Sequence, residues 1–163
     1  MASYEGIYHP LRSDREITDQ AEIDAIIASQ RYMTLAMCLD NEPYLVTLSF
    51  GYEKEKKCFF FHCATEGKKL DFLRKNPVVW GQIVQDRGYI QGECSHAYSS
   101  VEFRGRVSIL KDSGEKKQAL YHMINQLEVA PDLVKTKQVD GKDLKKVVLC
   151  RVNIQAFSGK KAH

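Results

Sequence analysis

The sequence predicts a mainly β protein, in which short antiparallel strands form a barrel and helices pack on its outside. Three observations carry this prediction. Seven short segments are rich in Val, Ile, Phe, Tyr and Thr and are punctuated by turn residues, around 32–39, 43–52, 57–63, 78–84, 88–94, 99–110 and 146–154. Two other segments, 18–29 and 112–127, have apolar residues at helical spacing. No internal repeat or linker interrupts the 163 residues, so we expect a single domain over 1–163.

The first element is an amphipathic helix near the N-terminus. Thr18 is a good N-cap residue, and the helix is expected to run to about Ser29. Ile23, Ile26 and Ile27 fall on one face at helical spacing. We therefore expect this face to cover the core of the barrel.

The first strands are expected to be joined by two short connections. Residues 40–43 predict a tight hairpin turn, and the charged residues 53–57 predict a second connection. Between them, residues 43–52 alternate in character. One side of this strand carries Val46, Leu48 and Phe50, and the other carries Thr47, Ser49 and Gly51.

A strand that ends near residue 63 runs into a turn and a helix. Gly67 permits a sharp turn, and the helix that follows has an apolar side made of Leu70, Phe72 and Leu73. The unsatisfied amides and the positive dipole end of a helix N-terminus favour an anion, and Lys68 and Lys69 would add two cationic donors. This turn is a candidate phosphate site; the alternative is that both lysines belong to a solvated helix face.

The last third of the chain predicts one more helix and a final strand. Asp112 and Glu115 resemble a capping box. The helix that follows repeats apolar residues at helical spacing, namely Ala119, Leu120, Met123, Ile124 and Leu127. Pro131 is expected to break it, and the basic stretch 135–146 is expected to be a surface loop with at most one helical turn.

Charge and cysteine content exclude several classes of function. The net charge is +3, so nothing favours nucleic-acid binding over the whole surface, and the lysine runs, including 160–161, are expected to be mostly solvated. Five widely spaced cysteines without a CxxC pair predict reduced thiols and no metal site. Neither a signal peptide nor a membrane-spanning run is present, so we expect a soluble, cytoplasmic protein.

The segment from the strand through Lys68-Lys69 to Leu73-x-x-Asn76-Pro77 resembles the second flavin-binding segment of the pyridoxamine 5′-phosphate oxidase-like superfamily, the FMN-binding split barrels. Other matches extend over most of the chain and resemble the flavin-nucleotide-binding branch, which includes nitroimidazole-reductase-type proteins. They are Arg12, Asp14, Arg15, Glu16 and Ile17 at the start, residues 31–37 and 43–52 as the first two strands, and residues 98–101 with Gly105 as a later strand.

This resemblance implies a six-stranded antiparallel split β-barrel of Greek-key type, and a homodimer with FMN at the subunit interface. Lys68 and Lys69 match the basic pair that binds the FMN phosphate. Gly67 replaces a serine of the oxidases, so one hydroxyl contact is lost while the amide remains. The other matching positions are His62 and Cys63 at the strand end that lines the flavin, Val46, Thr47, Leu48 and Ser49 under the ring system, and Ser100 and Val101 reaching in from the partner subunit.

Several of these side chains have a structural alternative. His62 is the candidate catalytic residue because histidine titrates near neutral pH, although a lone histidine at a strand end usually satisfies a backbone group; His96 ranks below it. Cys63 reads as a packing residue unless Lys68 and Lys69 give it an electropositive setting. Thr47 and Ser49 fit ordinary outward-facing positions of a strand.

The resemblance predicts an FMN-dependent oxidoreductase acting on a small organic substrate, such as an NAD(P)H-linked nitroreductase. No Gly-x-Gly-x-x-Gly fingerprint is present, so NAD(P)H would bind only transiently. The sequence lacks the Trp- and Arg-rich C-terminal segment of true pyridoxamine-phosphate oxidases, and its sole tryptophan is Trp80; vitamin B6 oxidation is therefore not expected. The alternatives are a non-catalytic flavin-storage protein and a haem- or deazaflavin-binding split barrel.

Overall fold

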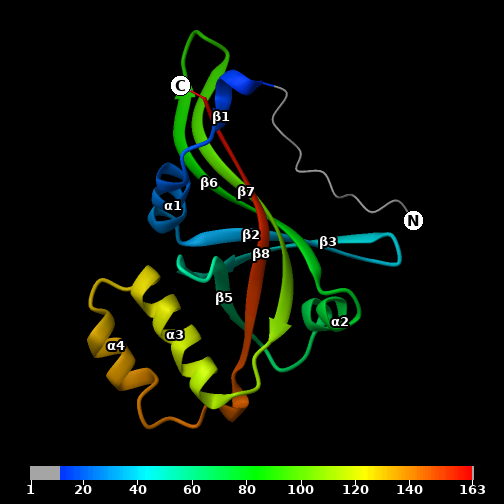
Figure 1. Ribbon diagram of the computed structural model, residues 1–163, viewed down its shortest axis with the longest axis vertical. Helices are drawn as coiled ribbons and strands as arrows, with labels where there is room; N and C mark the ends of the chain where they lie inside the picture. The colour runs from blue at the N-terminus through cyan, green and yellow to red at the C-terminus, as the bar shows by residue number, and fades with distance from the viewer. Residues whose placement is uncertain (1–11, 163) are drawn as a thin grey trace.

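Eight strands form one antiparallel sheet in the order β3-β2-β6-β7-β8-β5-β4, and β1 pairs with β8 beside this path (Figure 1). The computed structural model describes residues 12–162. Its strands are β1 (Glu16–Ile17), β2 (Tyr32–Leu39), β3 (Glu42–Ser49), β4 (Gly51–Glu53), β5 (Cys58–Cys63), β6 (Val78–Ile90), β7 (Ser95–Ile109) and β8 (Val148–Ala162). Its helices are α1 (Gln20–Ser29), α2 (Lys68–Lys75), α3 (Ser113–Leu127) and α4 (Pro131–Gln138), with 3₁₀ turns at Ser13–Arg15 and Leu144–Lys146.

The mainly antiparallel class of the split barrel is confirmed, but the strands are more numerous than the six expected. Residues 43–52, expected to form one strand, divide at Phe50 into β3 and β4. β3 pairs with β2, whereas β4 pairs with β5, so these consecutive strands occupy the two ends of the sheet order. The chain must bend where it changes partner, and the fully buried Phe50 anchors that bend in the core.

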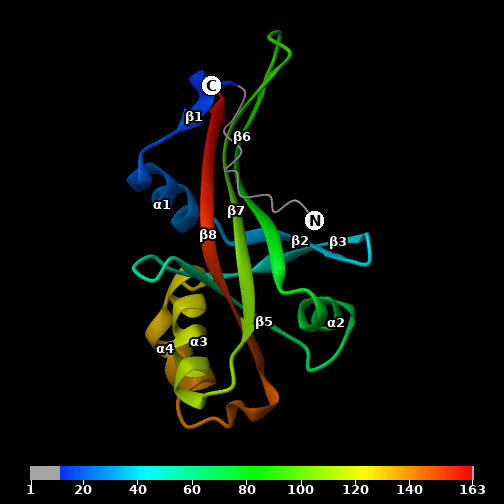
Figure 2. The same cartoon turned by 45° about the vertical axis from the view of Figure 1, so that its right-hand side comes forward.

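The strands expected at 78–84 and 88–94 are wrong as separate elements, because β6 runs without a break from Val78 to Ile90 and residues 91–94 form the turn to β7. A register shift between Asp86 and Gly88 lets the strand pass without ending. Asp86 Oδ1 accepts a hydrogen bond of 2.7 Å from the Gly88 amide. This bond spans the irregular step, so the polar segment that contains Gly88 remains part of the strand. The resulting β6–β7 hairpin extends well beyond the rest of the sheet (Figure 2).

Helices α1 and α3 confirm the two helices that the apolar periodicity of the sequence predicted. Ile23, Ile26 and Ile27 of α1 are buried as expected. Its N-cap is Asp19 rather than Thr18, because the Asp19 carboxylate accepts a hydrogen bond from the Ala21 amide at 2.9 Å. Asp112 caps α3 as predicted and accepts a hydrogen bond from the Glu115 amide.

The expected loop over 135–146 is wrong in part, because α4 covers its first residues. Pro131 does not end α3, which already stops at Leu127. It is instead the first residue of α4, where a backbone N–H would have no acceptor within the helix. The C-terminal lysines, which were expected to be mostly solvated, belong to β8, because this strand continues to Ala162. Within it, Lys161 Nζ lies 2.7 Å from Glu22 Oε1 of α1.

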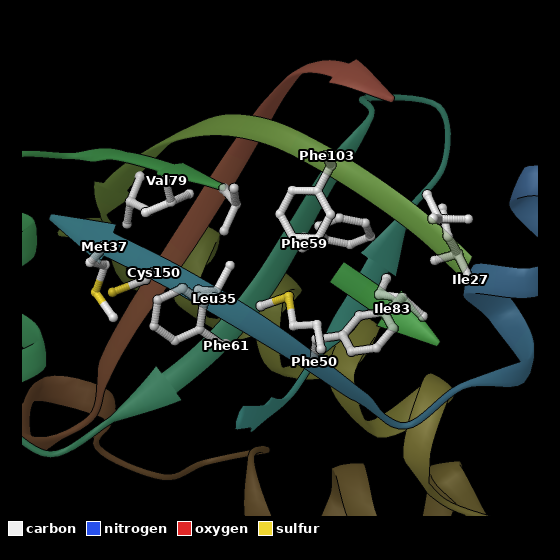
Figure 3. Packing of buried hydrophobic residues seen from close by; sticks show 14 of the residues in the cluster. Ile27, Leu35, Met37, Phe50, Phe59, Phe61, Val79, Ile83, Phe103 and Cys150 are labelled. Carbon is white, nitrogen blue, oxygen red and sulfur yellow. The ribbon is translucent and has the colours of Figure 1, made fainter. Parts of the chain in front are cut away.

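The largest fully buried side chains of the barrel interior are Phe50, Phe59, Phe61 and Phe103 (Figure 3). The ring centroids of Phe59 and Phe103 are 4.8 Å apart, and those of Phe59 and Phe50 are 5.3 Å apart. Gly81 makes room for this packing, since a Cβ there would lie 2.2 Å from the Phe103 ring. On the other side of β5, Phe60 packs with α3 residues in a second apolar cluster. Because both faces of β5 are buried, its sequence is apolar without alternation.

Candidate functional site

The candidate site begins where the loop after β5 enters α2. Gly67 has φ 126° and ψ 166°, a backbone conformation restricted almost entirely to glycine. No side chain caps this helix, and its first backbone bond runs from the Asp71 amide to the Gly67 carbonyl. The amides of residues 68–70 therefore have no acceptor within the helix. No atom lies within 4 Å of the position that a Cβ of Gly67 would occupy, so the space beside these amides is open.

Lys68 and Lys69 lie at the start of α2, where they were expected. Lys68 Nζ lies 4.7 Å from the centroid of the Tyr44 ring of β3, and Lys69 Nζ lies 5.6 Å from that of Phe61 in β5. The one acidic side chain of the first turn, Asp71, is 3.7 Å from Arg74. Two ammonium groups and open amides thus share one end of a helix, an arrangement that attracts a phosphate.

The last two residues of β5 point to opposite faces, as alternation requires. Cys63 lies on the barrel side with Phe61, and it packs against the main core cluster. A hydrogen bond from the Cys150 thiol lowers the pKa of Cys63 to about 7; burial opposes this shift, and the charges of Lys69 and Arg74 add to it. The same hydrogen bond, together with burial, raises the pKa of Cys150.

His62 is exposed and faces α3 instead. It lines a cavity of about 320 Å³ together with apolar residues of α3 and α4, among them Leu120, Met123, Leu127 and Val134. Figures 1 and 2 both place α2 on the opposite side of the molecule from α3 and α4. The structure therefore does not bring the His62 side chain together with the lysine pair, although the residues are close in sequence.

The β3 residues divide as the sequence predicted. Val46 and Leu48 are half-buried and pack against the core, whereas Thr47 is exposed on the outer face, with its Oγ1 3.3 Å from Thr34 Oγ1 of β2. Ser49 is paired with Tyr32, also on the outer face. This outer face of β3, β2 and β6, which we call the outer sheet face, also carries four exposed large apolar side chains: Tyr32, Leu45, Trp80 and Val84.

Ser100 and Val101 of β7 also alternate. Val101 is fully buried in the core, so its side chain does not reach any surface. Ser100 pairs with Val84, so it lies on the β7 continuation of the outer sheet face, but it is buried. The expected site residues therefore fall into two groups: Cys63, Gly67, Lys68 and Lys69 around the start of α2, and Thr47, Ser49 and Ser100 on the outer sheet face.

Two further features concern residues that sequence reasoning did not pair or did not place. Cys150 contacts Cys63 from β8, and nothing in the sequence signals this pair because most of the chain separates the two residues. His96 Nε2 lies 2.7 Å from Asp86 Oδ1 on the projecting β6–β7 hairpin, and this contact lowers the pKa of Asp86. His96 is thus committed to a local pair at the far end of the molecule from α2 (Figure 1).

No helix of residues 12–162 has the length and apolar character needed to cross a membrane. In the same range, no group of three or more His, Cys, Asp or Glu side chains is placed to hold a metal ion. All five cysteines are free.

A family model described as pyridoxamine 5′-phosphate oxidase matches residues 19–161. A proposed 5-nitroimidazole antibiotic resistance protein from Bacteroides thetaiotaomicron VPI-5482 is 23% identical, with a TM-score of 0.72 over 90% of this chain and 86% of that chain. An FAD-binding protein from Mesorhizobium loti is 25% identical, with a TM-score of 0.66 over 91% of this chain and 98% of that chain. The flavocytochrome Anf3 from Azotobacter vinelandii is 16% identical, with a TM-score of 0.79 over 96% of this chain and 73% of that chain.

One curated relative is an uncharacterized protein of Rhizobium meliloti (strain 1021), which is 28% identical over 69 residues. That match covers 42% of this chain and spans less than half, 44%, of the relative. The structural likenesses cover most of this chain and share its split-barrel fold.

Proposed function

The chain belongs to the pyridoxamine 5′-phosphate oxidase family, and we propose that it binds FMN and uses it as an oxidoreductase on a small organic substrate. Similar folds include an FAD-binding protein and a flavocytochrome, so flavin binding is the property that the family membership supports. The choice of FMN and the oxidoreductase activity are our proposal.

The start of α2 is the observation that carries the proposal. FMN ends in a phosphate monoester, which presents several negatively charged oxygens to one small site. The amides of residues 68–70 and the ammonium groups of Lys68 and Lys69 match that group in charge and in hydrogen-bond donors. Gly67 leaves the approach open, since no atom lies within 4 Å of its Cβ position. FAD, whose phosphates are internal to a diphosphate diester, would use this compact site less well.

The outer sheet face would receive the ring system. Thr47 and Ser49 supply hydroxyl groups there, beside exposed apolar side chains that suit an aromatic ring. Two copies of the chain joined through this face would supply both walls of a cleft, so we propose a homodimer. Bound FMN supplies the redox chemistry, and the protein holds and orients it. NAD(P)H would act as a transient electron donor.

The phosphate site is tested with the double variant Lys68→Ala/Lys69→Ala. Each lost charge-assisted contact is worth about 1.5–3 kcal/mol, so the Kd for FMN should rise at least tenfold. The matched control is Lys145→Ala/Lys146→Ala, which removes the same charge from two adjacent exposed lysines of the second 3₁₀ turn. Titration of the apoprotein, followed by flavin fluorescence, measures both. Equal affinities in the two variants would remove Lys68 and Lys69 from the site.

The identity of the cofactor is tested separately on the purified protein. Its visible spectrum, with the mass of the released chromophore, distinguishes FMN from FAD, deazaflavin and haem. Turnover of NADH or NADPH with a nitroaromatic acceptor then separates an oxidoreductase from a storage protein. FMN release without any turnover would support storage.

A further inference from the structure

Two thiols from strands far apart in sequence lie on the same face of the sheet. In the β5–β8 pair, Phe61 is opposite Cys150 and Cys63 is opposite Val148. Cys63 and Cys150 are therefore diagonal neighbours on one face, and interaction with Cys150 is the main cause of the lowered pKa of Cys63. Cys150 is fully buried beside the core phenylalanines (Figure 3). Cys63 is only half-buried.

Two cationic side chains, Lys69 and Arg74, act on Cys63, the more accessible of the two thiols. Lys69 Nζ lies 5.6 Å from the ring of Phe61, the residue directly opposite Cys150. The charges of Lys69 and Arg74 both favour the thiolate of Cys63, in addition to the hydrogen bond from Cys150, and its pKa is about 7. A large fraction of Cys63 is therefore thiolate at neutral pH, which is the nucleophilic form.

We propose that Cys63 and Cys150 form a reversible redox pair, in which a hydroperoxide oxidises Cys63 and Cys150 converts the product to a disulfide. The Cys63 thiolate attacks a peroxide oxygen, so an S–O bond forms, the O–O bond breaks and the leaving oxygen takes a proton. Cys150 then loses its proton as its sulfur attacks the Cys63 sulfur; the S–S bond forms and hydroxide leaves as water. With hydrogen peroxide, two thiols lose two electrons and the peroxide becomes two waters.

The position of Cys63 lets the bond close. Diagonal neighbours in an antiparallel pair have Cα atoms about 7–8 Å apart, slightly more than a disulfide spans. Cys63 is the last residue of β5, so a small shift there disrupts no further pairing of that strand. The chain then passes directly to Gly67 and Lys68. Oxidation would thus alter the start of α2, which lies only a few residues away.

The other cysteines provide contrasts within the same chain. Cys58 is buried, and burial together with Glu53 raises its pKa to about 11, so it should not react. Cys38 and Cys94 are exposed, so their rates of oxidation and alkylation serve as the reference for accessible cysteines.

The test is oxidation of the reduced full-length protein with equimolar hydrogen peroxide, followed by alkylation and non-reducing peptide mass spectrometry. The expected product is a Cys63–Cys150 linked peptide that disappears on reduction, with Cys38 and Cys94 still alkylated. At pH 7, the thiolate fractions of Cys63 and Cys58 differ by roughly 5,000-fold, given pKa values of about 7 and about 11. The less basic thiolate is also the weaker nucleophile, so an alkylating reagent should label Cys63 on the order of a hundredfold faster than Cys58.

Two conservative variants separate the roles. Cys150→Ser should leave a Cys63 sulfenic acid that dimedone traps, and Cys63→Ser should leave Cys150 unmodified. The proposal is overturned if peroxide oxidises Cys63 no faster than Cys94, or if no Cys63–Cys150 link forms in a wild-type chain that remains folded by circular dichroism. None of these measurements requires bound flavin, so this outcome is independent of the proposed function.

Discussion

Gly67 holds a backbone conformation that other residues adopt only under strain. We expect Gly67→Ala to lower the free energy of unfolding by about 1–3 kcal/mol, and to weaken FMN binding because the amides of α2 shift. Gly92→Ala is the control, since Gly92 also has a positive φ, 83°, but lies in the distant β6–β7 turn. Urea unfolding should detect a loss in both variants. If the FMN Kd rises equally in both, the effect is not specific to the site.

His62 was predicted to be the proton donor, but its side chain faces the α3–α4 cavity and not the lysine pair of the proposed FMN site. We therefore expect His62→Ala to leave turnover and FMN occupancy close to those of the wild type; a loss of turnover of about 10²–10⁴-fold would instead support the predicted general acid or base. His96→Ala is the control, as His96 is paired with Asp86 instead. Unchanged turnover would leave His62 as a surface residue of the α3–α4 cavity.

For single residues, the face of a strand on which a side chain lies could be predicted from the sequence. Contacts between residues distant in the sequence could not. Strand alternation alone separates His62 from Cys63, so their placement on opposite faces was available from the sequence. The contact between Cys63 and Cys150 was not, because it depends on the register of β5 against β8. Val101 likewise matched a family position, yet its side chain is in the core.

Helix α1 is tied to the short strand β4 by one buried carboxylate. Asp24 accepts hydrogen bonds from Tyr52 and Gln20, at 2.8 and 3.0 Å, and Lys54 Nζ lies 3.0 Å away. Burial alone would raise the pKa of Asp24, but the hydrogen bonds from Lys54, Tyr52 and Gln20 outweigh it and the pKa lies below its ordinary value of 3.8. The charged form of Asp24 therefore stabilises the fold.

This tie predicts a pH-dependent loss of stability. A lowered folded-state pKa gives stability that is complete above the unfolded value and disappears as the pH falls through the folded value. We expect Asp24→Asn to cost about 1–3 kcal/mol at pH 7, with the difference from wild type shrinking below about pH 4. Urea titrations across this range measure it, with the exposed Asp71→Asn as control. A difference that stays constant into acid would contradict the assignment.

The existence of most elements could be predicted, but their ends depended on tertiary structure. Asn76 ends α2 as expected, because its backbone amide bonds back to Phe72 and Pro77 follows. The division of residues 43–52 into β3 and β4 at Phe50 could not be predicted from the local sequence. It occurs because the chain changes its pairing partner there, from β2 to β5. Gly51 shows the same limit: a Cβ there would lie 2.4 Å from the Met123 amide, so this glycine is needed for α3 to approach β4.

The outer sheet face makes the assembly testable at the level of the whole molecule. Leu45 is 64% exposed, so Leu45→Asp should leave the monomer folded while burying a charge in the proposed dimer. We expect light scattering to show a dimer for wild type and a monomer for Leu45→Asp. Leu133→Asp is the matched control, because Leu133 is 75% exposed on α4, away from this face.

The fluorescence of Trp80 provides a second measure of the equilibrium between monomer and dimer. It is the sole tryptophan of the chain and lies on the outer sheet face. Its emission should shift to longer wavelength in Leu45→Asp and on dilution of wild type, as water reaches the ring. A monomeric wild type at micromolar concentration would contradict the proposed dimer.

The fold class could be predicted from strand count and composition, and the order of strands in the sheet could not. β8 is the last strand in the sequence, yet it lies between β7 and β5 and also holds β1. No local pattern reports such a position, because it follows from pairings between segments more than 80 residues apart, such as Phe61 with Cys150.

The central place of β8 has a consequence for synthesis on the ribosome. Until β8 emerges, β5 and β7 present open edges, and the phenylalanine core has no strand to join its two halves. At about 5–20 residues per second, the nascent chain spends seconds in this state. Chaperones that shield exposed strands should therefore matter more for the yield of this protein than its final stability would indicate.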